Sequence, residues 1–291
     1  MVAPRHFALF ALLFCRAAHG QWFGDIAVES QYNDNLPRAE RASNAHGDLS
    51  LGFTTRGGYH VQPGDFTGLT LSTSLTGVRY DTYEGLNNIE AGLGVNLSHK
   101  FGLGERVPQL SFDAGVARAS YRTDIRDAWI YSTGLTLSKR LDERFSLSGF
   151  LRHETSDGDH SLRKTPPPAP KPGNVWDFDV LTAGLQSEVD LGPATWLGAS
   201  YRYQHGDVVS SSPTYARIVA AATAITNDPV FGPATIAYRL PASTQLYSVD
   251  INRAVLDAGT VYFGLEYQDT SGENEIDYAV KLIRAGFIYG F

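Results

Sequence analysis

The chain has 291 residues, which is enough for one large β domain or two smaller domains, and its formal net charge at pH 7 is −7. Its 29 glycines, 15 tyrosines and 15 phenylalanines, against a single methionine, favour strands and turns over packed helices. The acidic balance argues against a nucleic-acid partner, because such partners attract basic surfaces.

The first 20 residues predict a secretory signal peptide. A basic start at Arg5 precedes an apolar run that ends at Cys15, and small residues lead to a cleavage site after Gly20. The run is about half as long as the roughly 20 apolar residues of a membrane anchor. Cleavage lowers Lys plus Arg from 24 to 22 against 31 acids, a formal net charge of −9, and leaves residues 21–291 without cysteine. Neither disulfides nor thiolate metal sites are then available.

Twelve segments with alternating apolar and polar residues follow, and a period of two predicts β-strands. In chain order they are DIAVESQY, DLSLGFTTRGGY, TGLTLSTSLTG, EAGLGVNLSH, QLSFDAGVA, WIYSTGLTLSK, RFSLSGFLRHE, VLTAGLQSEV, TWLGASYRYQ, QLYSVDIN, VYFGLEYQ and KLIRAGFIYGF. The fold class expected is therefore all-β.

The gaps between these strands alternate in length. Short gaps such as VQPGD, RLDER and LDAG alternate with long ones, among them Asp34 to Gly47, a stretch through KTPPPAPKPG, and Asp207 to Ser243. A transmembrane barrel inserted from the periplasm has short turns on the inner side and long loops outside. This pattern predicts an up-and-down antiparallel barrel of residues 21–291 with both termini in the periplasm.

The polar face of the strands distinguishes a membrane barrel from a soluble one. It consists mainly of Gly, Ser and Thr, while aromatic residues such as Trp22, Tyr59, Trp129 and Tyr201 gather near strand ends. A lipid-facing apolar band with aromatic girdles around a wet lumen has this composition. Since every backbone group in lipid must be paired, the last strand is expected to close on the first.

The mature chain resembles Gram-negative outer-membrane β-barrels. The final strand ends on Phe291, and such barrels typically end on an aromatic residue that the barrel assembly machinery recognises. The first strand ends in QYNDNL, which is similar to the Tyr-x-Asp-Asn opening of some β-barrel porins, here Tyr32, Asp34 and Asn35. Turn chemistry explains the same residues, because Asn and Asp side chains bind their own backbone.

Twelve charged residues fall on the predicted inward face, eight acids and four bases. They are Asp25, Glu29, Asp48, Arg56, Glu90, Asp113, Arg152, Glu188, Arg202, Asp250, Glu266 and Arg284. One interpretation is a path that favours cations; the other is a set of ion pairs that brace a filled barrel. About eight strands leave a filled interior and about 16 an open channel, so both alternatives stay open.

Enzymatic chemistry has little support in the sequence. No Gly-x-Ser-x-Gly occurs, and the acids and histidines of DGDHS (157–161) and of the two HGD runs (46–48 and 205–207) form no complete ligand set. We expect no catalytic residues, no metal and no cofactor. The Ala-rich segment Tyr215–Ile225 predicts a short helix that either narrows the mouth or rests on lipopolysaccharide or a neighbour.

These observations lead to three functional hypotheses. The first is an outer-membrane channel for small polar or cationic solutes, gated by the loop from Asp207 to Ser243. The second is a non-conducting barrel that anchors or helps to export a polysaccharide or partner protein. An outer-membrane hydrolase is the third. Outer-membrane lipid, lipopolysaccharide and the assembly machinery are the expected partners.

Overall fold

The computed structural model describes residues 20–159 and 173–291, and strands account for most of them. The expected signal peptide and the KTPPPAPKPG segment lie outside the described residues, apart from Gly20 and Gly173. The wall strands are β1 (Gly20–Asn33), β2 (Asp48–Gly64), β3 (Thr67–Tyr80), β4 (Asn88–Lys100), β5 (Gln109–Tyr121), β6 (Ala128–Arg140), β7 (Phe145–Gly158), β8 (Phe178–Gly192), β9 (Thr195–Ser212), β11 (Ile236–Val255), β12 (Gly259–Gly272) and β13 (Asp277–Gly290).

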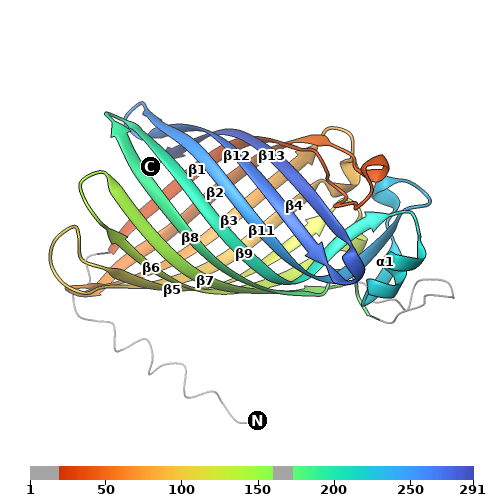
Figure 1. Ribbon diagram of the computed structural model, residues 1–291. Helices are drawn as coiled ribbons and strands as arrows, with labels where there is room; N and C mark the ends of the chain where they lie inside the picture. The colour runs from red at the N-terminus through yellow and green to blue at the C-terminus, as the bar shows by residue number, and fades with distance from the viewer. Residues whose placement is uncertain (1–19, 160–172) are drawn as a thin grey trace, which may run out of the picture.

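Short elements connect the strands. They are the helix α1 (Ala216–Ala221), the strand β10 (Ala224–Asn227) and the 3-10 turns η1 (Ala42–Asn44), η2 (Glu84–Leu86), η3 (Asp124–Arg126), η5 (Pro229–Phe231) and η6 (Glu273–Glu275). All of them lie at one end of the barrel, to the right in Figure 1. We call this the loop end; the opposite end, with the short connections and the C-terminus, is the turn end.

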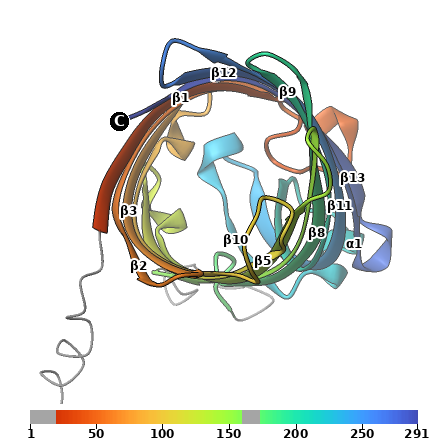
Figure 2. The same ribbon diagram turned by 90° about the vertical axis from the view of Figure 1, so that its left-hand side faces the viewer.

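The twelve wall strands form a closed antiparallel barrel, as the alternating sequence pattern predicts. Consecutive strands pair along the chain, β9 pairs with β11, and β1 pairs with β13 from Asp25 opposite Gly290 to Asn33 opposite Leu282. Phe291 extends this last seam, since its N–H donates to Gly24 O at 2.9 Å and its C=O accepts from Gly24 N at 3.0 Å. Figure 2 shows the closed ring from the turn end.

The outer surface of the wall is apolar. Alternate residues such as Leu51, Leu93 and Leu185 expose 56%, 62% and 56% of their surface. An exposed apolar surface of this extent is unfavourable in water. Outward aromatics pair across strands: the rings of Trp22 and Tyr59 lie 4.8 Å apart. This surface matches the lipid-facing band of a transmembrane barrel. Among the described residues no helix is long and apolar enough to cross a membrane.

Two strands run further than the sequence pattern predicts. β9 continues to Ser212 and β11 begins at Ile236, so strand pairing enters the segment from Asp207 to Ser243 that was expected to be loop. Ser212 pairs with Ile236 at the far end of this ribbon. β12 pairs with β11 only from Ala242 onward, and β10 takes the free edge of β11 between Ile236 and Arg239.

Candidate functional site

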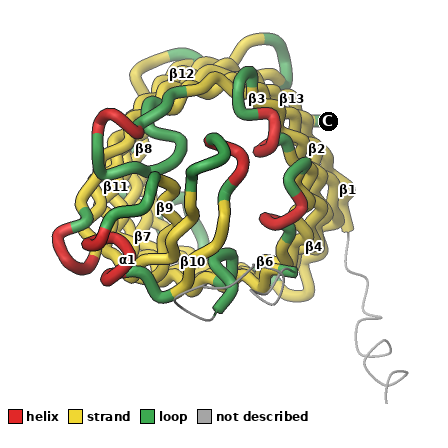
Figure 3. Tube along the Cα trace, turned by 90° about the vertical axis from the view of Figure 1, so that its right-hand side faces the viewer, coloured by secondary structure: helices red, strands yellow, loops and turns green. Residues whose placement is uncertain are grey.

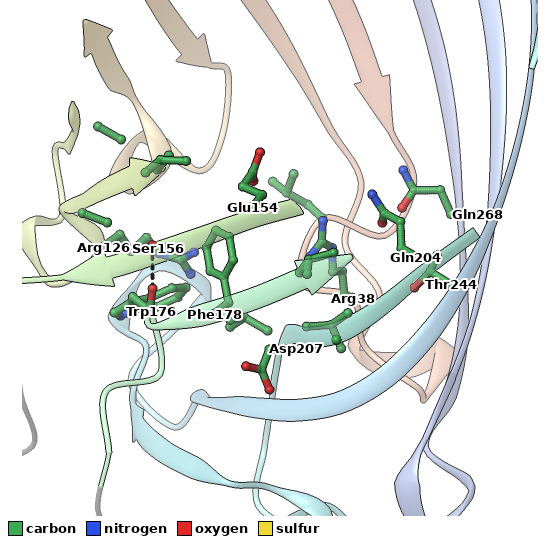
Figure 4. A pocket seen from close by; sticks show the side chains of 18 of the residues that line it. Arg38, Arg126, Glu154, Ser156, Trp176, Phe178, Gln204, Asp207, Thr244 and Gln268 are labelled. Carbon is green, nitrogen blue, oxygen red and sulfur yellow. Dashed lines mark hydrogen bonds between the residues drawn. The ribbon is translucent and has the colours of Figure 1, made fainter. Parts of the chain in front are cut away.

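The loop end encloses a cavity of about 820 Å³ inside the barrel. The final or first residues of most wall strands line it, together with the loop after β1 and the tip of the hairpin that β10 and β11 form. Figure 4 shows arginine, amide, hydroxyl and aromatic side chains converging on this space. Its polar lining and its position across the lumen make it the candidate functional site.

The loop after β1 folds into the barrel because its first residues bind the last strand. The carboxylate of Asp34 accepts the N–H of Lys281 at 2.7 Å. The side chain of Asn35 donates to Ala279 O at 3.1 Å, and its Oδ1 accepts the N–H of Ala39 at 2.9 Å. The Asp-Asn pair of the QYNDNL motif therefore forms a turn that ties the first loop to β13.

That turn presents Arg38 to the cavity. The backbone of Arg38 has a φ of 54°, in the left-handed region that side chains other than glycine rarely adopt. Strand β9 holds it there: Ser210 Oγ donates to Arg38 O at 2.7 Å, and Ser211 N donates to Pro37 O at 2.8 Å. The Arg38 side chain is exposed to the cavity, and no carboxylate of the described residues lies within 4.0 Å of it.

A hairpin crosses the mouth of the barrel. Its strands are β10 and the first residues of β11, and they lie inside the ring of wall strands in Figure 3. At its tip the Phe231 ring lies 5.0 Å from the ring of Tyr83, which precedes η2 between β3 and β4. Val230 packs over Gly85 so closely that a Cβ on Gly85 would lie 2.9 Å from a Val230 methyl carbon. The hairpin thus reaches from β11 to the opposite side of the mouth.

An ion pair fastens the hairpin to the wall. Arg126 Nη2 lies 2.5 Å from Asp228 Oδ2, and Ser211 Oγ donates to the same oxygen at 2.6 Å. Asp228 is fully buried and the Arg126 side chain is 13% exposed. Burial lowers the pKa of Arg126 and the carboxylate of Asp228 raises it, but a guanidinium stays charged in proteins.

Aromatic rings complete this fastening. The Arg126 guanidinium carbon lies 4.1 Å from the centre of the Trp176 ring and 5.9 Å from that of Phe231. Both distances are within the range of cation–π attraction. We call Arg126, Trp176, Asp228 and Phe231 the latch.

The short helix predicted within Tyr215–Ile225 is present as α1, but the first of its two predicted places, a constriction in the mouth, is wrong. Ile218 is fully buried against Tyr238, Leu240 and Ile276, which belong to β11 and to the residue after η6. Figure 3 shows α1 at the rim of the ring. Its apolar face therefore packs on the extended end of β11, and the hairpin that follows it enters the mouth instead.

Several predicted inward charges are brought together near the middle of the lumen. Glu266 on β12 lies between Arg202 on β9 at 2.6 Å and Arg284 on β13 at 3.9 Å. Beside them, Tyr262 donates to Glu29 at 2.5 Å. On another part of the wall Arg152 pairs with Glu154 at 3.2 Å. Of the residues in these pairs, Arg152, Glu154 and Arg202 line the cavity.

The other predicted charges form no ion pair with these residues within the described part of the chain. Asp48 is buried at the loop end, where its carboxylate accepts the N–H groups of Thr82 and Tyr83 at 3.1 and 2.9 Å and so serves as a loop cap. The six remaining predicted charges lie elsewhere along the strands; they are Asp25, Arg56, Glu90, Asp113, Glu188 and Asp250. Asp25 lies opposite Arg56, whereas the other four acids lie opposite or beside uncharged residues: Glu90 opposite Thr76, Asp113 beside Gly134, Glu188 opposite Ser146 and Asp250 beside Gly198. None of these six lines the cavity.

The sequence analysis missed Arg38 and the latch. These residues come from loops and from a hairpin, where the period-two pattern assigns no face. Asp34 and Asn35 were the one available sign, because they mark a turn, but nothing in the sequence says which way the turn leads. In the described part of the chain no group of three or more His, Cys, Asp or Glu residues could hold a metal ion. His205, from one HGD run, bonds Ser243 at 3.0 Å; His160 and Ser161 lie outside the described residues.

Comparison with known proteins identifies the fold class. No protein-family model and no curated protein matches the sequence. Among solved structures, an outer-membrane channel from Pseudomonas putida F1 aligns over 100% of both chains with a TM-score of 0.61 and 13% identity. The NanC porin aligns over 91% of this chain and 98% of its own, with a TM-score of 0.46 and 9% identity. The chain has an outer-membrane β-barrel fold, as the Pseudomonas putida channel does.

Proposed function

We propose that the protein is an outer-membrane channel through which small polar solutes pass by diffusion. The observation that carries this proposal is the polar space inside a closed wall: a cavity of about 820 Å³, lined by arginine, amide and hydroxyl side chains, behind a mouth that one hairpin crosses. A barrel built only to anchor a partner has no need of a polar cavity. The proposed orientation puts the loop end outside the cell and both termini in the periplasm.

Eight acids on the wall do not by themselves make the path favour cations, because several of them are engaged by neighbouring groups. Glu266 faces two arginines, Glu29 accepts from Tyr262, and Asp48 caps a loop. The cavity itself is lined by four arginines and two acids. Any preference for cations is therefore expected in the turn-end half, where Asp25, Asp113, Glu188 and Asp250 lie.

The alternative is a barrel that does not conduct and that anchors or helps to export a polysaccharide or a partner protein. The latch is the observation that favours it, because a buried ion pair holds the hairpin across the mouth. Outer-membrane lipid and the assembly machinery are proposed partners in either case.

Liposome swelling distinguishes the two functions. Liposomes that hold the purified protein and a trapped large polymer are diluted into isotonic solutions of small sugars of increasing size. A channel lets the sugars enter, and swelling follows at a rate that falls with sugar size. Swelling no faster than in protein-free liposomes, for the wild type and for a variant without residues 223–235, would support the non-conducting barrel.

A further inference from the structure

Arg38 differs from the other arginines that line the cavity. Arg126 pairs with Asp228, Arg152 with Glu154, and Arg202 with Glu266, each within 3.2 Å. Arg38 has no carboxylate within 4.0 Å among the described residues, and its side chain is exposed to the cavity. Tyr80 at the end of β3, Tyr121 at the end of β5 and Leu282 on β13 line the same cavity as Arg38.

The charged groups of the neighbouring wall leave the positive charge of Arg38 uncancelled. Glu266 lies between Arg202 and Arg284, and Glu29 lies beside them, so the two arginines and two carboxylates of this group carry no net charge. The other two acids of the cavity lining do not offset the charge of Arg38: Glu154 pairs with Arg152, Asp207 accepts the N–H of Asp179 at 3.3 Å, and neither lies within 4.0 Å of the Arg38 guanidinium. An anion that enters the cavity meets the unpaired guanidinium of Arg38.

The structure also builds a firm support for Arg38. Asn35 holds the turn to β13, and Ser210 and Ser211 hold the residues around Arg38 to β9. A left-handed backbone at a residue other than glycine is unfavourable, and such conformations persist where the surrounding contacts determine them. An arginine whose guanidinium only contacts water does not require a fixed backbone conformation. This support pre-organises the charge for a ligand.

We propose that the cavity binds a small organic carboxylate at Arg38, with hydrogen bonds to the rest of the ligand from neutral polar groups. A guanidinium fits a carboxylate because two N–H groups can donate to its two oxygens. Gln204, on β9, also lines the cavity, and its side-chain amide makes no hydrogen bond within the described part of the chain. It suits a hydroxyl group of the ligand. The inference extends the proposed channel function, in which the site would take up the solute before passage.

Gluconate and sorbitol are the probes for this site, because they share a polyhydroxyl chain and differ at one end by the carboxylate. Each is titrated calorimetrically into the purified, folded barrel in detergent micelles. Arg38→Gln should weaken gluconate binding by at least about tenfold, the usual effect of a lost charge-assisted hydrogen bond, and Arg38→Lys should weaken it less. Sorbitol binding should not change. Should Arg38→Gln fail to fold, Arg38→Gly replaces it, since glycine suits a φ of 54°.

Arg79→Gln is the matched control, because Arg79 lies at the same end of the barrel opposite outward-facing Leu51. It should bind gluconate as the wild type does. Equal gluconate affinity in the wild type and Arg38→Gln, or no binding at all, overturns the proposal. Current recordings on the same samples test the channel separately. If the barrel passes no current but its gluconate affinity falls in Arg38→Gln, the result supports this site and refutes the channel. If the barrel conducts and its gluconate affinity is the same in Arg38→Gln, the result refutes the site alone.

Discussion

Replacing Asp228 with asparagine should free the hairpin from the mouth. The substitution keeps the shape of the side chain but leaves Arg126, whose side chain is 13% exposed, without its carboxylate. Breaking a buried ion pair in this way costs about 3–5 kcal/mol, because the remaining charge stays desolvated. At about 1.4 kcal/mol per factor of ten, the hairpin should leave its closed position roughly 100 to 4,000 times more readily.

Hydrogen exchange measured by mass spectrometry reports this opening directly. The N–H of Asp228 donates to Thr235 O at 2.9 Å, and β10 pairs with β11 from Ala224 to Asn227. Peptides from this hairpin should exchange much faster in Asp228→Asn, while peptides from β1 and β2 keep their protection. The preserved protection of the wall shows that the barrel remains folded.

Glu84→Gln is the control for this prediction. Glu84 pairs with Arg122 at the same end, but their side chains are 49% and 61% exposed. Exposed pairs contribute about 0–1 kcal/mol, so exchange in the hairpin should hardly change. If hairpin exchange is equally slow in Asp228→Asn and in the wild type, the ion pair does not hold the hairpin, and the reasoning about the latch is refuted.

Three further predictions concern topology, assembly and lumen charge. A protease added to intact cells should cut near KTPPPAPKPG, residues 164–173, and cutting only after the outer membrane is permeabilised would reverse the proposed orientation. Deleting Phe291, which pairs with Gly24 at the closing seam, should sharply reduce the folded, heat-modifiable band on unboiled gels; an unchanged band would show that closure does not need it. Glu266→Gln leaves Arg202 and Arg284 without their shared acid and should shift the reversal potential toward anions, most at low salt because screening is then weakest; no shift would mean that these charges do not face the path.

The wall of the barrel was predictable because each strand carries its own pattern. Leu49, Leu51 and Phe53 alternate with small polar residues, and lipid on one side and water on the other require this alternation. Phe291 likewise predicted closure at the end of the chain, and it pairs with Gly24. These features depend on local periodicity, which the sequence displays directly.

The interior of the mouth was not predictable in the same way. The position of Arg38 depends on Asn35 reaching Ala279, and that of Asp228 depends on Arg126, each pair far apart in the chain. The apolar residues of α1 had two possible burial sites, the lumen and the side of β11, and composition alone does not choose between them. The long-range pairing of β9 with β11 provides the surface that α1 covers.

Single-channel recording in a planar bilayer tests the central claim, passage through the lumen, most directly. The wild-type barrel should give small, discrete current steps. A variant without residues 223–235 should give steps several times larger, because the hairpin that crosses the mouth is gone while the paired wall strands remain. If the shortened variant folds and inserts but passes no current, the lumen is filled below the mouth and the protein is not a channel.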